Sequence, residues 1–340
     1  MRSTSSFFVI GLSLVICAEA GVIKIWIAES CRTYVPMIAP TIDSALLRAR
    51  LGQQKLLELQ EQKLQNSNLT PEMVQIDLAV EWLLTARGME DAAGRFDRIG
   101  RFEFDGVSTG LWGDAEKGKV GDVIIYCGFK RFKFNEKMQL WHDTVNNIKI
   151  IKELYEELIA VNTGHLATVS QNAGPPNVAV SSVTLLAGGL DLWWNHYLGR
   201  KQTSWNAGRE VDRLHANWIA EFMTRSQSTK PWIDTFGDML DATLLHEFSH
   251  VVEAGSSEDT EELNSYGWDN ALDIRRSDNA GQFQRLSFVI LPDEQVENLM
   301  FFATATKLVT LGYELREDGS WDNLHQDPNS ARPACGRSML

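Results

Sequence analysis

Two histidines and a glutamate in LLHEFSHV (244–251) have the spacing of a zinc-binding helix. On an α-helix, residues four apart lie on one face, so His246 and His250 can present two imidazole nitrogens to one metal ion. Glu247 projects about 100° around the axis, where its carboxylate can reach a metal-bound water. Zinc lowers the pKa of that water towards about 7, and the carboxylate takes its proton as the water attacks a polarised carbonyl. The pattern therefore predicts peptide-bond hydrolysis with Glu247 as general base, which then protonates the leaving amine.

The residues around the motif favour a helix. Residues 242–254 are helical by composition, and Asp241 and Gly255 flank them as helix-boundary residues. A chance H-E-x-x-H is expected at roughly 0.01 per chain with this number of histidines. Two histidines that only form hydrogen bonds within a protein core would not also require a glutamate between them. We therefore prefer zinc, one ion per chain, to a coincidence on an ordinary helix.

The motif and the segment after it are similar to a known family. LLHEFSH followed by SYGWDNA (265–271) resembles the deuterolysin-like zincins, or aspzincins, which include the fungal lysine-specific metalloendopeptidases. In that family a G-T-x-D-x-x-Y-G element follows, and its aspartate is the third zinc ligand. DVIIYCGFKRF (122–132) and VENLMFFATATKL (296–308) are also similar to the family's strand and helix on either side of the catalytic helix. The resemblance spans about residues 70–312 and implies an α+β zincin fold, with the active-site helix beside a small β-sheet and helices elsewhere.

The third zinc ligand is where this chain departs from the family pattern. Leu263 stands at the position of the aspartate, and leucine cannot bind zinc. Glu262 is one position off when counted from Tyr266, and a loop longer by one residue lets it reach the metal. We therefore choose Glu262, because oxygen ligands of either acid bind zinc at about 2.0–2.2 Å. The alternatives in the same loop are Asp259, which is our second choice, Glu258 and Glu261.

Tyr266 has two interpretations under the same resemblance. Its phenol can donate a hydrogen bond to the developing oxyanion, which would make it a catalytic residue. It can instead pack beneath the zinc with its hydroxyl satisfied. Asp269 and Asn270 can bond to a ligand histidine, but we favour a role for them in capping the next helix.

The N-terminal segment indicates the cellular compartment, and the net charge limits the classes of binding partner. Residues 1–20 have one basic residue, an apolar run of eleven residues and small residues at the cut, as in a secretory signal peptide. We expect a secreted, extracellular protein that has no membrane contact after signal removal and is a monomer. The net charge of −13 argues against nucleic acid as a partner, since phosphate binding needs clustered lysines and arginines. Three cysteines remain after the signal, and their pairing stays open among Cys31, Cys127 and Cys335.

Periodicity and turn residues divide the rest of the chain. We expect residues 21–70 to be a helical segment serving as a propeptide or an arm, 71–315 to be the zincin-like domain, and 316–340 to be an irregular tail. Helices are predicted at 41–65, at 71–87 with Thr70 as N-cap and Gly88 as stop, at 147–161 and at 293–312. Strands are predicted at 122–127, 177–187 and 191–194, with Gly188 and Gly189 as a turn between the last two.

These observations lead to one functional hypothesis and one alternative. The hypothesis is a secreted zinc endopeptidase that cleaves polypeptides, with an edge of the sheet to which an extended peptide adds. The alternative is a degenerate zincin that binds a peptide or protein without turnover, which Leu263 favours. The intact Glu247 argues for turnover, because a binding module does not need the base.

Overall fold

The structure is a computed structural model in which residues 22–84, 88–107, 122–143, 146–160, 167–171, 181–198, 233–237, 239–255, 267–279 and 296–323 are described. Its helices are η1 (Glu29–Tyr34), α1 (Val35–Leu64), α2 (Pro71–Leu83), α3 (Gly88–Gly100), α4 (Lys152–Ile159), α5 (Ala187–Leu198), α7 (Asp234–Gly237), α8 (Leu240–His250), η2 (Val252–Ala254), α9 (Trp268–Asn279) and α10 (Val296–Thr310). Its strands are β1 (Lys24–Ile27), β2 (Glu103–Val107), β3 (Val123–Cys127), β4 (Phe132–Asn135), β5 (Leu140–Asp143), β6 (Ile148–Ile151), β7 (Ala167–Gln171), β8 (Ser181–Leu185), β9 (Tyr313–Leu315) and β10 (Trp321–Asn323).

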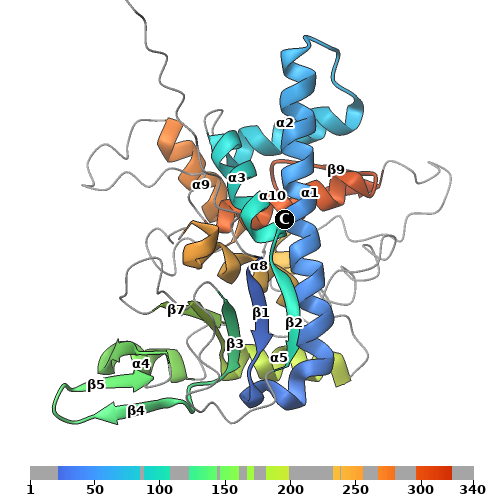
Figure 1. The fold of residues 1–340 in the computed structure, drawn as a ribbon. Helices are drawn as coiled ribbons and strands as arrows, with labels where there is room; N and C mark the ends of the chain where they lie inside the picture. The colour runs from blue at the N-terminus through green and yellow to red at the C-terminus, as the bar shows by residue number, and fades with distance from the viewer. Residues whose placement is uncertain are drawn as a thin grey trace, which may run out of the picture.

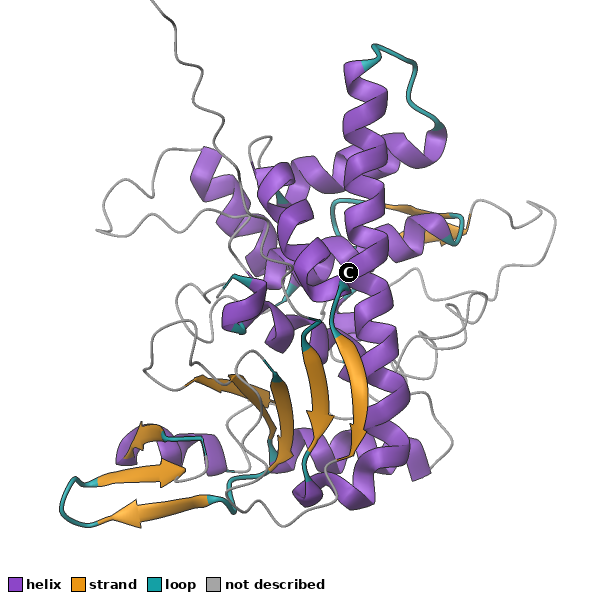
Figure 2. Cartoon of the chain, in the orientation of Figure 1, coloured by secondary structure: helices purple, strands orange, loops and turns teal. Residues whose placement is uncertain are grey.

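The fold is α+β, with one main sheet and a group of helices at one end of it (Figures 1 and 2). The sheet has the order β2-β1-β3-β8-β7, in which β7 alone runs antiparallel to its neighbour. All five residues of β3 and all five of β8 are buried, as expected for inner strands of a sheet that is covered on both faces. Three further antiparallel strands, β4-β5-β6, form a separate small sheet that projects from the body.

Helix α1 is the longest element and holds the helical half together. It packs against α3, α8 and α10, and its apolar residues Leu46, Leu56 and Leu59 are at most 2% exposed. The close approach to α3 depends on Gly52, because a Cβ there would lie 3.1 Å from the Phe96 ring. Since β1 lies inside the main sheet, residues 24–64 belong to the same core as the histidine helix.

A buried ion pair joins α1 to the first turn of α8. The Arg48 guanidinium lies 2.9 Å from the Asp241 carboxylate, and both side chains are fully buried. The Ser44 hydroxyl donates to the same carboxylate at 2.7 Å, and Arg48 also donates to the Thr304 hydroxyl of α10. Nearby on α10, burial lowers the pKa of the Lys307 ammonium to about 7, and the Arg48 charge acts in the same direction. Three helices therefore meet at one charged centre.

Several predicted elements are confirmed and others are wrong. The helices expected at 41–65, 242–254 and 293–312 correspond to α1, to α8 with η2, and to α10, where residues 293–295 lie outside the described part. Strand β3 lies where 122–127 predicted a strand. The turn and strand expected at 188–194 are instead helix α5, because Leu190 and Trp193 lie on one helical face that is buried in the core. Residues 313–323, expected to be largely irregular, form the β9–β10 hairpin, whose Trp321 is 3% exposed.

Two helix boundaries also differ from the prediction. Helix α2 begins with the expected Thr70 cap, whose hydroxyl accepts from Met73 N, but it ends at Leu83 and Gly88 starts α3. Its last carbonyls are taken by side chains from later helices, since Asn298 donates to Leu83 O and Arg275 donates to Leu84 O, each at 2.7 Å. The helix predicted at 147–161 is strand β6 followed by α4.

One disulfide is present in the described part of the chain. Cys31 at the start of η1 pairs with Cys127 at the end of β3, which resolves a pairing that the sequence left open. Cys335 lies outside the described residues. Among those described, no helix is long and apolar enough to cross a membrane.

We expect Asp241→Asn to lower the free energy of unfolding by about 3–5 kcal/mol, because it leaves the Arg48 charge buried without its counter-ion. Urea unfolding followed by circular dichroism measures this. Asp77→Asn is the matched control: Asp77 pairs with Lys63 at an exposed site, where an ion pair contributes about 0–1 kcal/mol. Equal small losses in both variants would contradict a central role for the buried pair.

Candidate metal centre

Helix α8 brings the two motif histidines together with their ring nitrogens converging. His246 Nε2 lies 3.2 Å from His250 Nε2, and the two rings are nearly perpendicular at 73°. A tetrahedral zinc bonded to two imidazoles at about 2.0–2.1 Å holds their nitrogens about 3.3–3.4 Å apart. The observed separation is close to that value, and it is also the distance of a hydrogen bond between the two rings.

The burial around the pair suits a metal centre that opens to one side. His246 is 6% exposed and Glu247 is 5% exposed, whereas His250 is only partly buried. The opposite face of the helix is anchored by Leu244, Leu245 and Phe248, each at most 1% exposed. That burial fixes the helix backbone from which both histidine side chains project.

Helix α8 ends directly after the second histidine, and arginines fix the turn that follows. Val251 leaves the helical conformation with ψ 147°, and Gly255 has φ 106°, which favours glycine. From α3, Arg98 donates to Ala254 O at 3.0 Å and Arg95 donates to Gly255 O at 3.1 Å. These bonds fix the direction of the chain directly after the two histidines.

The same turn is tied to the main sheet. The Ser181 hydroxyl at the start of β8 donates to Glu253 Oε2 at 3.1 Å and accepts from Val252 N at 3.4 Å. Burial raises the pKa of the Glu253 carboxyl, against the hydrogen bonds from Ser181 and the backbone, which lower it. Since β7 pairs with β8 and also contacts α8, this link holds the sheet edge beside the histidines.

The Gly-Trp part of the YGW element is held in place at the start of helix α9. Gly267 has φ 99°, and the next amide, Trp268 N, donates to the Asp234 carboxylate at 2.8 Å. The Trp268 ring is fully buried, and its Nε1 donates to Glu317 O at 2.8 Å. Asp234 thus binds the first turn of α9, the role expected of Asp269 or Asn270, and Asp269 lies inside that turn.

The predicted third ligand and Tyr266 lie outside the described residues. Residues 256–266, which contain Glu258, Asp259, Glu261, Glu262 and Leu263, are not described. Within the ranges that are, no group of three or more His, Cys, Asp or Glu side chains is placed to hold a metal ion. The described residues thus bring two imidazoles together, with Glu247 next to the first in the chain, and the zinc ion and its third ligand stay predictions.

The Arg-aromatic stretch that contributed to the resemblance forms a buried network at the end of β3. The Arg131 guanidinium lies 3.8 Å from the centre of the Tyr126 ring and 2.8 Å from Asp143 Oδ2. It also donates to the hydroxyls of Ser182 and Thr184 in β8. Burial raises the pKa of Tyr126 to about 12 and lowers that of Arg131. This network attaches the small sheet to the main sheet, and it does not include His246 or His250.

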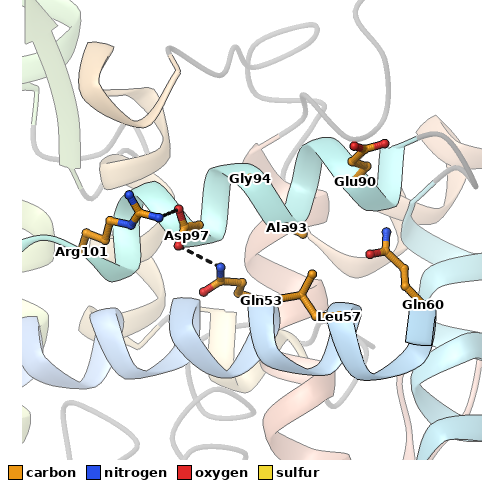
Figure 3. A pocket seen from close by; sticks show the side chains of 8 residues that line it. All are labelled: Gln53, Leu57, Gln60, Glu90, Ala93, Gly94, Asp97 and Arg101. Atoms are coloured by element: carbon orange, nitrogen blue, oxygen red, sulfur yellow. Dashed lines mark hydrogen bonds and ion pairs between the residues drawn. The ribbon is translucent and has the colours of Figure 1, made fainter. Parts of the chain in front are cut away.

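A groove between α1 and α3, of about 510 Å³, lies apart from the motif (Figure 3). Three of its polar side chains bind one another: Gln53 donates to Asp97 at 2.9 Å, and Arg101 pairs with the same carboxylate. None of the motif residues lines it.

Comparison with known proteins found no matching family model, no matching curated protein and no matching solved structure.

We expect purified protein to bind one zinc ion per chain, and His246→Ala and His250→Ala each to abolish stoichiometric binding. His142→Ala is the control, because His142 lies on β5 outside the motif and should leave binding unchanged. Metal content after dialysis, measured by mass spectrometry, distinguishes the cases. Zinc retained by both motif variants would disprove the site.

The third ligand is tested by single substitutions in the 256–266 segment. We expect Glu262→Ala to weaken zinc binding by at least about tenfold, since three protein ligands are the usual minimum in catalytic sites. Competition with a chelating dye measures the affinity, with Asp259→Ala and Glu258→Ala as parallel variants. If Asp259→Ala alone weakens binding, our assignment of Glu262 is wrong and Asp259 is the ligand.

Proposed function

We propose that this protein is a secreted zinc-dependent endopeptidase with a zincin-type fold, similar to the deuterolysin-like family. The observation that carries the proposal is the 3.2 Å approach of His246 Nε2 to His250 Nε2, with the buried Glu247 between them in the chain. Two convergent imidazoles and a neighbouring carboxylate are the parts that water activation at zinc requires.

Each residue of the motif has a distinct task in this proposal. His246 and His250 hold the metal, which when bound lowers the pKa of a coordinated water and polarises the scissile carbonyl. Glu247 accepts the proton of the attacking water on its carboxylate and passes it to the departing amine. Its near-complete burial keeps bulk water from competing for that proton. No covalent bond to the protein forms in this scheme.

The sheet offers a place for an extended substrate. Strand β7 pairs only with β8 among the described strands, and in this proposal its other edge takes the substrate as a further strand. The contact of β7 with α8, and the Ser181–Glu253 bond, place that edge near the end of the histidine helix. A polypeptide added there would run past His246 and His250, which supports polypeptide as the substrate class.

A second candidate is a zincin that binds peptide without turnover. The observation that favours it is Leu263 at the position where the family has its aspartate ligand. Weak metal retention would leave the sheet edge and the helix intact while removing catalysis. The two candidates share the binding mode and differ only in zinc occupancy and in the need for Glu247.

We expect Glu247→Gln to lower casein hydrolysis by at least about 10²–10⁴-fold, because the amide cannot take a proton, while zinc binding is retained. Glu253→Gln is the matched control, six residues along, and should keep most activity because glutamine can still accept from Ser181. Removal of zinc with 1,10-phenanthroline should stop hydrolysis, and added zinc should restore it. A zinc-loaded parent with no activity above Glu247→Gln would favour the binding module.

A further inference from the structure

The small sheet β4-β5-β6 with helix α4, here called the arm, has a basic outer face in an otherwise acidic chain. The full sequence has 45 acidic and 32 basic residues, whereas the strand region of the arm, residues 128–151, has five lysines and arginines against two acids, and helix α4 adds one lysine and three glutamates. One of those acids, Asp143, is buried against Arg131. The arm projects from the body beside the main sheet (Figure 1).

Strand register places two lysines on either side of a histidine in one row. Lys133 of β4 lies opposite His142 of β5, and His142 lies opposite Lys149 of β6. Because side chains alternate across a strand, these three share the face opposite to Phe132 and Ile150, which are buried towards Tyr155 of α4.

Four lysines at 130–149 differ in their partners from several other lysines of the structure, including Lys152 at the start of α4, which pairs with Glu156. Lys24, Lys55 and Lys63 each form an ion pair with a carboxylate. Lys130, Lys133, Lys137 and Lys149 are exposed, and none has an ion pair to a described residue. Ile151, 61% exposed, adds apolar surface to the same face at the end of β6. The face thus offers two lysines without an ion pair to a described residue, together with an apolar contact.

We propose that the outer face of the arm binds acidic segments of polypeptides. At physiological ionic strength the Debye length is about 8 Å, so the distant acidic surface is screened and the local lysines dominate. A membrane surface fits less well, because Ile151 alone of the exposed apolar side chains in these three strands lies on the lysine face. Phe134 lies on the opposite face against Trp141, and Leu154 lies on α4 among Glu153, Glu156 and Glu157.

The arm is fixed to the body close to the proposed substrate edge. Arg131 at its base donates to Ser182 and Thr184 of β8, and β8 is the strand next to β7. An acidic stretch held on the arm would therefore place neighbouring parts of the same polypeptide near β7. That consequence for substrate choice rests on the proposed endopeptidase function, whereas binding to the arm does not.

The test uses the full chain with Glu247→Gln, so that no peptide is cleaved. Fluorescein-labelled poly-glutamate should bind in fluorescence anisotropy, with an affinity that falls as salt rises. Lys133→Gln with Lys149→Gln should weaken binding by roughly tenfold. Lys24→Gln with Lys63→Gln removes the same charge from the body and is the matched control, expected to change affinity less than twofold.

Three outcomes would overturn the proposal. They are no binding of poly-glutamate at low salt, equal losses in the two double variants, and binding confined to phosphatidylserine vesicles. Circular dichroism confirms that both double variants fold. Since peptide binding is measured without turnover, its failure leaves the endopeptidase proposal standing, and inactivity in the casein assay leaves the arm proposal standing.

Discussion

The buried ion pair between Arg48 and Asp241 is the contact on which the placement of the site depends. It joins α1 to the first turn of the histidine helix at zero exposure, and Ser44 and Thr304 add hydrogen bonds to it. Two desolvated charges at 2.9 Å tolerate little displacement, since separating them exposes each to an apolar interior. The rotation of α8 about its axis is thereby set, and with it the direction of both imidazoles.

The other end of the helix is held by different means. Two arginines of α3 bind the carbonyls of Ala254 and Gly255, and Ser181 binds Glu253. The two histidines therefore lie between the buried Arg48–Asp241 ion pair and the hydrogen-bonded turn that follows α8. Strand β7 contacts the same helix. Gly255 and Gly267, both with positive φ, stand directly before and after the segment that contains the predicted third ligand. Both ends of that acidic segment are thus attached to the body at defined points.

Residue spacing within one helix predicted the features of the site that depend on that helix alone. The four-residue spacing of His246 and His250 was enough to expect one shared face, and the 3.2 Å separation agrees with it. The sequence offered no comparable signal for Asp234, which binds Trp268 N from 34 residues away, or for the arginines of α3. Helix α5 was missed because Gly188-Gly189 reads as a turn, while the burial of Leu190 and Trp193 depends on neighbours distant in the chain. Contacts between distant segments decided each of these positions.

The central claim is that His246 and His250 bind one zinc ion for hydrolysis, and X-ray absorption at the zinc edge tests it most directly. The account predicts a four-coordinate site of nitrogen and oxygen ligands, with two imidazoles at about 2.0–2.1 Å and no sulfur. The imidazole scattering should vanish in the variant with both histidines replaced by alanine. Purified protein that retains no zinc, or a spectrum that both histidine replacements leave unchanged, would contradict the claim.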